Sequence, residues 1–500
     1  MASSAHRPPG SPGAGRALLA TAALAALFFV IGLGRADRLS ADGVVYDVVA
    51  RHLWLNTTIG RQALVGAAVW PPLPALLRLP AAPFGSAGDV GPYPSLLLSV
   101  IAGAAALVLL WRALGRWGAG WARAPVVLAV AAHPFFLAEL LGGGVGPLVL
   151  CGALLAAVGM ADWVADRSLR ALVRLAAGAA LLTGSSLDLI PWVAALFALL
   201  LLDLAFGRFA RGQRGAALWL AMLPAAGVAG LWFLANWLIM GDPGYFVRGL
   251  RSHVAPSPFP RPAPFPFSPL DAAAASLALG AAAVAAVRGR RAGVFLGLLS
   301  AAPPAIAFAL AARGVLWSPP PLLYIAGPLA LLAVAGHARG ARRPGAARAF
   351  VAAAALTLTA AAVARLPERS LHAPERATFT ALADQRGRWL PRIEARVRAR
   401  SPFSKVFVAG YDGLALLGAR PPDTFVPTLD FDFAAAERDY AGNRLYLLVR
   451  RPELRGALDA IHWKYPRIYE LGSRHTLYDS DWGDWRLFEI VQPRPGGPRP

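Results

Sequence analysis

Apolar runs of about 20 residues, the length that a helix needs to cross a bilayer, recur between positions 17 and 366 and are separated by short polar loops. The first run leads directly into Arg35 and Asp37 without a small-residue cleavage site, so we expect it to remain as a membrane helix. The pattern predicts a mainly α-helical polytopic membrane protein of about 11 transmembrane helices. The predicted spans are 17–34, 91–111, 122–138, 144–161, 171–184, 188–206, 216–238, 271–287, 293–312, 320–337 and 349–365.

Arginine is distributed unevenly between the loops on the two sides of the predicted helices. Eighteen arginines fall in the N-terminal segment and in alternate, tightly clustered loops, whereas ten fall in the other loops. Because short arginine-rich loops stay in the cytoplasm, we expect 1–16 to be a cytoplasmic tail and 17–366 to be the transmembrane domain of a protein of the plasma (inner) membrane. Eleven spans then place 367–492 on the extracytoplasmic side.

Carboxylates show the opposite bias. Of the eleven acidic residues before position 366, eight fall on or near the predicted outer side. Carboxylates near a membrane are costly unless they are solvated or paired, so they tend to mark functional sites. This bias indicates either a polar cavity that opens outward or a set of solvated loop residues.

The composition changes after residue 366, where 21 basic and 17 acidic residues are typical of a soluble domain. Arg386–Arg400 has the pattern of a basic amphipathic helix suited to a membrane surface, and a second helix is predicted over Pro452–Tyr465. We expect 367–492 to form a small α/β domain and the Pro/Gly-rich segment 493–500 to form a disordered tail. Strands are predicted at Lys405–Gly410, Asn443–Arg450, Arg467–Leu471 and Arg486–Val491, with a turn at Asp481–Asp484. The acidic and aromatic run Asp479–Trp485 is interpreted as a tight turn rather than as a sugar or calcium site.

Composition excludes several classes of protein. Hydrophobic residues make up 57% of the 500 residues and charged residues only 15%, against about 25% charged in a soluble domain. The single cysteine, Cys151, excludes a disulfide framework. The net charge of +21 comes from arginines in membrane-flanking loops, so we predict no nucleic-acid partner. No Walker-type loop, dinucleotide fingerprint or metal-spaced histidine cluster is present, and we predict no cofactor; the sequence does not indicate a divalent metal.

The first predicted outer loop, 35–70, carries the motifs that indicate chemistry. It contains Asp42-Gly43-Val44-Val45-Tyr46 followed by Ala50, and its end leads into Pro71-Pro72-Leu73. This pattern resembles the GT-C superfamily of polytopic glycosyltransferases, and within it the protein O-mannosyltransferase and aminoarabinose-transferase branch. Those proteins have a first span, an outer loop with Asp-(Glu)-x-x-Tyr-x-x-x-Ala, and a Pro-Pro-Leu-(Tyr) segment. Here Gly43 stands where Glu is usual and Pro74 where Tyr is usual. Ala132-His133-Pro134 with Glu139, and Asn236–Tyr245, also resemble segments of this superfamily.

The resemblance implies a membrane glycosyltransferase that moves a sugar from a polyprenyl-phosphate donor to a glycan, lipid or protein acceptor on the extracytoplasmic side. Asp42 is the candidate general base, since an acceptor hydroxyl needs a carboxylate within hydrogen-bond reach, and Asp37 is the second choice. The structural alternative for Asp42 is a helix N-cap.

Further residues are candidates for binding substrate. Tyr46 lines the sugar site or packs as a core aromatic, and Glu139 and Asp188 are either substrate contacts or carboxylates at helix ends. Arginine binds phosphate through its planar fork of donors, and the alternative for each arginine is an interfacial anchor. The candidates for the phosphate are Arg51, Arg248, Arg251 and Arg313.

Two other functions remain open from the sequence. The first is a transporter or flippase of lipid-linked sugars, a class that usually shows internal repeats; we find none. The second is an inactive scaffold of the same fold, which the absence of Glu at position 43 keeps open.

Overall fold

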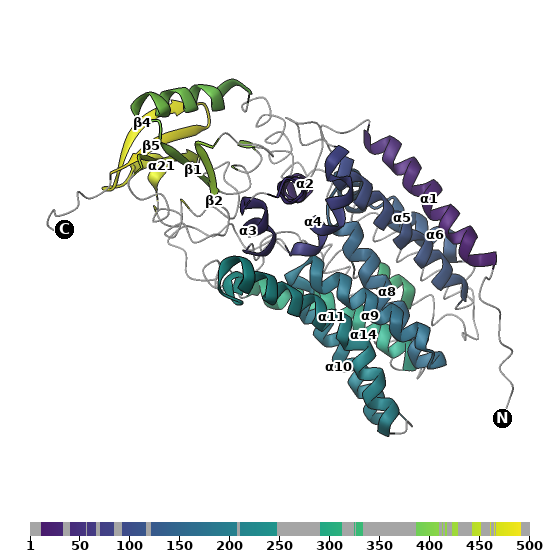
Figure 1. The fold of residues 1–500 in the computed structure, drawn as a ribbon. Helices are drawn as coiled ribbons and strands as arrows, with labels where there is room; N and C mark the ends of the chain where they lie inside the picture. The colour runs from purple at the N-terminus through teal and green to yellow at the C-terminus, as the bar shows by residue number, and fades with distance from the viewer. Residues whose placement is uncertain are drawn as a thin grey trace, which may run out of the picture.

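A computed structural model of the chain gives the fold (Figure 1). The structure describes residues 12–33, 41–56, 58–66, 71–84, 93–116, 122–207, 211–247, 291–312, 325, 327–333, 387–409, 413, 416–417, 423–428, 443–451, 461, 465 and 467–491.

Long apolar helices form the body of the protein, as predicted. In the described part of the chain, five are long and apolar enough to cross a membrane: Gly15–Leu33, Pro94–Arg116, Gly146–Asp166, Leu187–Phe206 and Gly212–Met240. The helices of the bundle are α1 (Pro12–Leu33), α5 (Tyr93–Arg116), α8 (Gly146–Asp166), α9 (Leu169–Ser185), α10 (Ile190–Phe206), α11 (Arg211–Met240) and α14 (Arg291–Ala312).

One predicted span is broken. The run 122–138 forms two short helices, α6 (Arg123–Ala131) and α7 (Pro134–Leu141). The break falls at His133-Pro134, because proline lacks the N–H that a continuous helix requires and is tolerated at the first helical position. The runs 271–287 and 349–365 lie outside the described residues, and only 325 and 327–333 of the run 320–337 are described, so the count of eleven stays a prediction.

The centre of the bundle is the pair α8 and α9, which have the most extensive contact of any two described elements. A Cβ built on Gly159 of α8 would lie 2.5 Å from the backbone nitrogen of Leu175 in α9. A Cβ on Gly178 of α9 would lie 2.4 Å from the backbone nitrogen of Ala156 in α8. Small residues therefore let the two backbones touch, as is common where helices pack in lipid.

Ion pairs join the helix ends that carry the arginine clusters. Arg116 at the end of α5 donates to Asp162 of α8 at 2.8 Å, and Arg174 of α9 pairs with the same carboxylate. Arg167 after α8 binds Asp203 of α10, with one N–O distance of 2.9 Å. Arg116, Arg167 and Arg174, which belong to two of the clusters predicted for cytoplasmic loops, thus lie at one end of the bundle. Which side of the membrane this end faces stays a prediction.

The opposite end carries the first predicted outer loop, which is helical. Its described residues form α2 (Ala41–Trp54) and α3 (Thr58–Gly66), and α4 (Pro72–Arg78) and the 3-10 helix η2 (Leu79–Phe84) follow the loop. α2, α4 and η2 pack against α5, and α3 packs against α2 and α11. α5 has 24 residues. Since a helix rises about 1.5 Å per residue, the two ends of α5 are about 35 Å apart.

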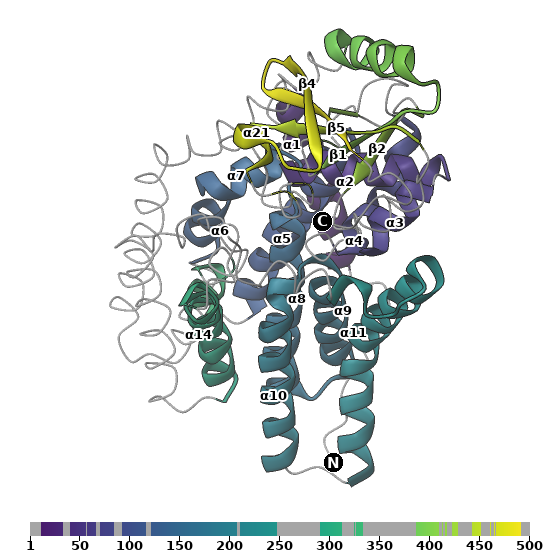
Figure 2. The same ribbon diagram turned by 90° about the vertical axis from the view of Figure 1, so that its left-hand side faces the viewer.

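The C-terminal part contains a five-stranded mixed sheet of order β2-β1-β3-β5-β4. β1 is parallel to both its neighbours, and the two C-terminal strands form an antiparallel hairpin next to β3. Figures 1 and 2 show the sheet at the end of the bundle that carries α2, α3 and α4. The strands are β1 (Lys405–Ala409), β2 (Phe425–Thr428), β3 (Leu445–Arg450), β4 (Thr476–Trp482) and β5 (Trp485–Ile490).

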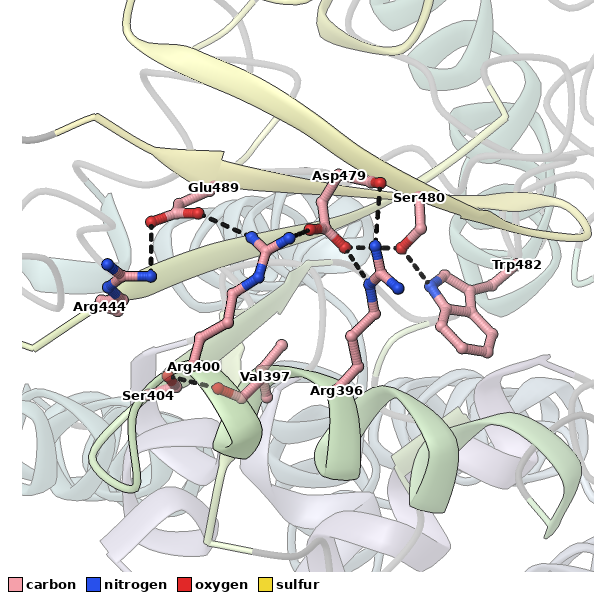
Figure 3. A network of polar contacts seen from close by, with 9 residues as sticks. All are labelled: Arg396, Val397, Arg400, Ser404, Arg444, Asp479, Ser480, Trp482 and Glu489. Carbon is pink, nitrogen blue, oxygen red and sulfur yellow. Dashed lines mark hydrogen bonds and ion pairs between the residues drawn. The ribbon is translucent and has the colours of Figure 1, made fainter.

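The predicted amphipathic helix spans 387–400 and covers the sheet. Its apolar residues Leu390, Ile393 and Val397 are buried in the core that includes strand residues, so this face packs on protein instead of lying on a membrane surface. Its arginines reach the strands (Figure 3): Arg396 donates to Asp479 at 2.6 Å, and Arg400 bridges Asp479 and Glu489 at 2.5 and 3.0 Å.

Two other predictions for this part have clear outcomes, and the rest fall on residues that the structure does not describe. The segment predicted as a strand at Arg467–Leu471 is a short helix, α21 (Ile468–Leu471), so that prediction was wrong. Asp479 lies within β4, and the tight turn is confined to Gly483 and Asp484 between the paired residues Trp482 and Trp485. Most of Pro452–Tyr465 and all of 493–500 lie outside the described residues.

Candidate functional site

The motif Asp-x-x-x-Tyr-x-x-x-Ala lies along α2. The helix begins at Ala41, so Asp42 is in its first turn, one residue inside the helix start. Its side chain lies outside the described residues. Tyr46 and Ala50 follow at successive turns on the same face, and both are buried. Tyr46 is therefore a packed aromatic, with its ring under the guanidinium of Arg78 at 4.9 Å from the centroid.

Asp47, the neighbour of Tyr46, is a buried carboxylate with three defined contacts. Ser95 at the start of α5 donates to its Oδ2 through the side-chain hydroxyl at 2.5 Å and through the backbone N–H at 3.2 Å. Arg78 Nε lies 3.7 Å from Oδ1. Burial raises the pKa of Asp47 to about 7, against the lowering effects of Arg78 and Ser95.

Arg78 joins α2 to the loop between α7 and α8. It is the last residue of α4, the helix that starts at the Pro71-Pro72-Leu73 motif. Its side chain is fully buried, and its NH2 group donates to the carbonyl oxygen of Gly143 at 2.8 Å. One guanidinium thus contacts the carboxylate of Asp47, the ring of Tyr46 and the backbone of the loop.

The loop 142–146 is glycine at every position but Val145, because it passes close to α5 and to Glu139. Gly143 has a φ of +70°, and a Cβ there would lie 2.8 Å from the Cβ of Ser95. A Cβ on Gly144 would lie 1.9 Å from Glu139 Oε2. The carboxylate of Glu139 accepts a hydrogen bond from the backbone N–H of Gly146 at 3.3 Å, where the helix dipole of α8 favours negative charge.

Two serines of α5 fix the neighbouring segments. Ser95 binds Asp47 of α2, and Ser99, one turn later, donates its hydroxyl to the backbone oxygen of Glu139 at 3.1 Å. The helix with the Asp42 motif and the helix with Glu139 are therefore positioned by adjacent turns of α5.

The other short helices are held by the bundle. Leu73 of the Pro-Pro-Leu motif packs directly on Gly184 near the end of α9. Trp232 of α11 donates its indole N–H to the backbone oxygen of Val65 in α3 at 3.0 Å and stacks on Phe246 at 4.2 Å. α3 and α4 are thus packed against the long helices α11 and α9.

The remaining candidates have different placements. Arg51 is half-buried in the last turn of α2, and Asp188 lies half-buried in the 3-10 helix η4 (Leu187–Leu189) between α9 and α10. Of the later motif, Asn236 is buried in α11, and Asp242 accepts the backbone N–H of Gly244 at 2.9 Å. Asp37, Arg248, Arg251 and Arg313 lie outside the described residues. Within the described ranges, no group of three His, Cys, Asp or Glu side chains could hold a metal ion.

The sequence pattern does not single out Asp47, Arg78 or Ser95 as site residues. Asp47 and Arg78 enter it only as two of the charged residues on the predicted outer side. One signal was present: Asp47 is flanked by Val45, Tyr46, Val48 and Val49 within a helix motif, and an acid among apolar neighbours indicates a buried, paired carboxylate. The partners could not be found from spacing, because Ser95 is 48 positions and Gly143 is 96 positions beyond Asp47.

No protein-family model matches the sequence, and no curated protein matches it at a significant level. The structure is similar to the crystal structure of ArnT from Cupriavidus metallidurans bound to undecaprenyl phosphate, with a TM-score of 0.53 and 15% identity over 98% of this chain and 100% of that chain. The apo structure of the same protein matches with a TM-score of 0.53 and 14% identity over 96% of this chain and 99% of that chain. ArnT is an aminoarabinose transferase with a GT-C fold. The fold that the first-loop motifs predicted is therefore confirmed.

Proposed function

We propose, from the GT-C fold that this chain shares with ArnT, that it is a membrane glycosyltransferase that takes a sugar from a polyprenyl-phosphate donor. The observation that carries the proposal is the match over 98% of the chain to a structure that holds undecaprenyl phosphate. The acceptor is a glycan, lipid or protein hydroxyl on the extracytoplasmic side.

The arrangement of the first loop supports the same chemistry. α2 and α4, which carry the two motifs, are packed against α5 and α9, and the Glu139 loop lies beside them. The proposed site therefore lies at the end of the bundle opposite the arginine-rich loops. A site there suits a donor that has its lipid in the bilayer and its sugar at the surface.

In the proposed step, the acceptor oxygen forms a bond to the anomeric carbon while the bond from that carbon to the phosphate oxygen breaks. Asp42 accepts the hydroxyl proton, and the electron pair leaves with polyprenyl phosphate. A positioned base contributes about 10²–10⁴-fold to such a step. Arg51, Arg248, Arg251 and Arg313 are the candidates to stabilise the phosphate, since a guanidinium binds it through two parallel donors. Asp37, Glu139 and Asp188 are the remaining candidates for contacts at this site, whereas Tyr46 packs under Arg78.

The test is to incubate purified protein with a panel of polyprenyl-phosphate sugars and candidate acceptors and to measure release of polyprenyl phosphate. Release that depends on acceptor and is lost in Asp42→Asn supports the proposal. Movement of intact lipid-linked sugar across proteoliposomes without release would instead identify a flippase. Absence of both, in protein that remains folded, would identify a scaffold.

A further inference from the structure

The buried pair Asp47–Arg78 contains charges that substrate does not reach. The side chains of Arg78 and Asp47 are 0% and 1% exposed, so neither a phosphate headgroup nor an acceptor contacts them in this structure. Removing a carboxylate and a guanidinium from water costs about as much free energy as their mutual attraction returns. An apolar pair would fill the same space without that cost. Net stability therefore does not account for the charged pair, whereas the directional contacts that it makes can.

Those contacts join four segments through directional groups. Asp47 of α2 is held by Ser95 of α5, and Arg78 of α4 is held by the carbonyl of Gly143 in the α7–α8 loop. A guanidinium offers five donors in one plane and at fixed angles. The pair therefore defines the orientation of α2 relative to the loop more closely than apolar packing would.

The position of the pair connects it to the motif residues. Asp42 precedes Asp47 by five residues, about 7.5 Å along a helix, and Tyr46, under Arg78, lies one turn after Asp42. On the other side, Ser99 holds the backbone of Glu139 one turn beyond Ser95. A rotation of α2 about Asp47 would change the separation between the first turn of α2 and Glu139.

We propose that Asp47 and Arg78 are positioning residues, which set the place of the Asp42-bearing turn of α2 relative to the Glu139 loop. The proposal rests on the proposed function for its effect on turnover, whereas the positioning itself can be measured without turnover.

The ion pair at the opposite end of the bundle provides a matched control. Asp162 is also a buried carboxylate between helices, paired with Arg116 and Arg174. It joins α5, α8 and α9 at a place where none of the candidate site residues described in the structure lies. Asp162→Asn should therefore remove an interhelical ion pair without affecting the geometry of α2.

The experiment compares Asp47→Asn, Ser95→Ala and Asp162→Asn in the full chain. Spin labels at Trp54→Cys and Ala132→Cys, both exposed positions, are introduced into a Cys151→Ala background, and the distance distribution between them is measured. We expect Asp47→Asn to broaden or shift the distribution, Ser95→Ala to do so less, and Asp162→Asn to leave it unchanged. An unchanged distribution in folded Asp47→Asn would overturn the proposal.

Turnover gives a second readout in the same variants. We expect kcat per folded molecule to fall by about 10- to 100-fold in Asp47→Asn, since small misplacements of reacting groups have effects of this size, with the donor KM within about twofold. The double variant Asp47→Asn/Arg78→Gln, which removes both charges, should regain stability without regaining kcat. If kcat returns together with stability, the pair is only structural and the proposal is wrong. If no donor is turned over by the unmodified protein, the proposed function fails and the label distances still decide the positioning.

Discussion

Arg78 and Gly143 are 65 positions apart in the sequence, yet the guanidinium of one donates to the carbonyl of the other at 2.8 Å in the interior of the protein. This bond connects the end of the Pro-Pro-Leu helix to the only part of the described α7–α8 connection that has a left-handed backbone. The conformation of the α7–α8 loop and the positions of α2 and α4 are therefore coupled.

Substitution at Gly143 should show this coupling as a loss of stability. We expect Gly143→Ala to lower the free energy of unfolding by about 1–3 kcal/mol, because its φ of +70° disfavours a side chain and the Cβ would overlap Ser95. Gly227→Ala in α11 is the control, since nothing lies within 4 Å of its Cβ position, and it should change stability by no more than about 1 kcal/mol. Denaturation in detergent measures both; equal effects would contradict the packing described for the loop.

Substitution at Asp42 separates catalysis from a helix-end role. We expect Asp42→Asn to lower turnover by about 10²-fold or more, because the amide cannot accept the acceptor proton, while stability changes by no more than about 1 kcal/mol. Asp42→Ala should also be inactive and should melt slightly lower if the residue stabilises the helix start. Turnover at the level of the unmodified protein in Asp42→Asn would exclude Asp42 as the base and transfer the role to Asp37 or Glu139.

The pKa of Asp47 predicts how stability depends on pH. Burial raises it from 3.8 to about 7, so the folded protein holds this proton over a pH range in which the unfolded chain has released it. This contribution to stability is full below about pH 4 and is lost as pH rises through about 7, with a maximal slope of about 1.4 kcal/mol per pH unit for one proton. Asp47→Asn should reduce the slope between these limits in thermal unfolding measured across pH. An identical slope in the variant would assign the dependence to other groups.

The predicted orientation can be tested with topology reporters. Fusions within the loop 208–214 and after Leu366 should give opposite signals, because the first lies in an arginine-rich loop and the second follows the last predicted span. Signals from the same side would contradict the orientation, and the proposed outer location of the Asp42 motif with it.

The helical part of the fold could be predicted well because lipid imposes a simple rule of length and apolarity. The runs at 17–34, 91–111, 144–161 and 216–238 each coincide with a helix of similar bounds. The exception is the run 122–138, which breaks into α6 and α7 at Pro134. The proline is a signal for this break, but the residues on both sides are apolar, so the run has the pattern of one span. In the C-terminal part, β4 could not be predicted because Asp479 and Asp481 have low strand propensity. In the folded chain, ion pairs with Arg396, Arg400 and Arg486 offset the unfavourable propensity of these two residues.

The site was predictable only in part, for a related reason. The motif residues Asp42, Tyr46 and Pro71-Pro72-Leu73 are close in sequence and could be found together. The residues that hold these motifs in place come from α2, α4, α5 and the α7–α8 loop, which are far apart in the sequence. One of their hydrogen bonds is accepted by the backbone carbonyl of Gly143, and a backbone atom has no sequence signature.

The glycine contacts between α8 and α9 restrict how this protein can move. Where Gly159 and Gly178 bring the two backbones together, no side chain lies between the helices that could change rotamer to permit sliding or rotation. A change of one helix axis must therefore carry the other with it, and the pair moves as one body. Conformational change in this protein must therefore take place around this pair, while α8 and α9 keep one arrangement relative to each other.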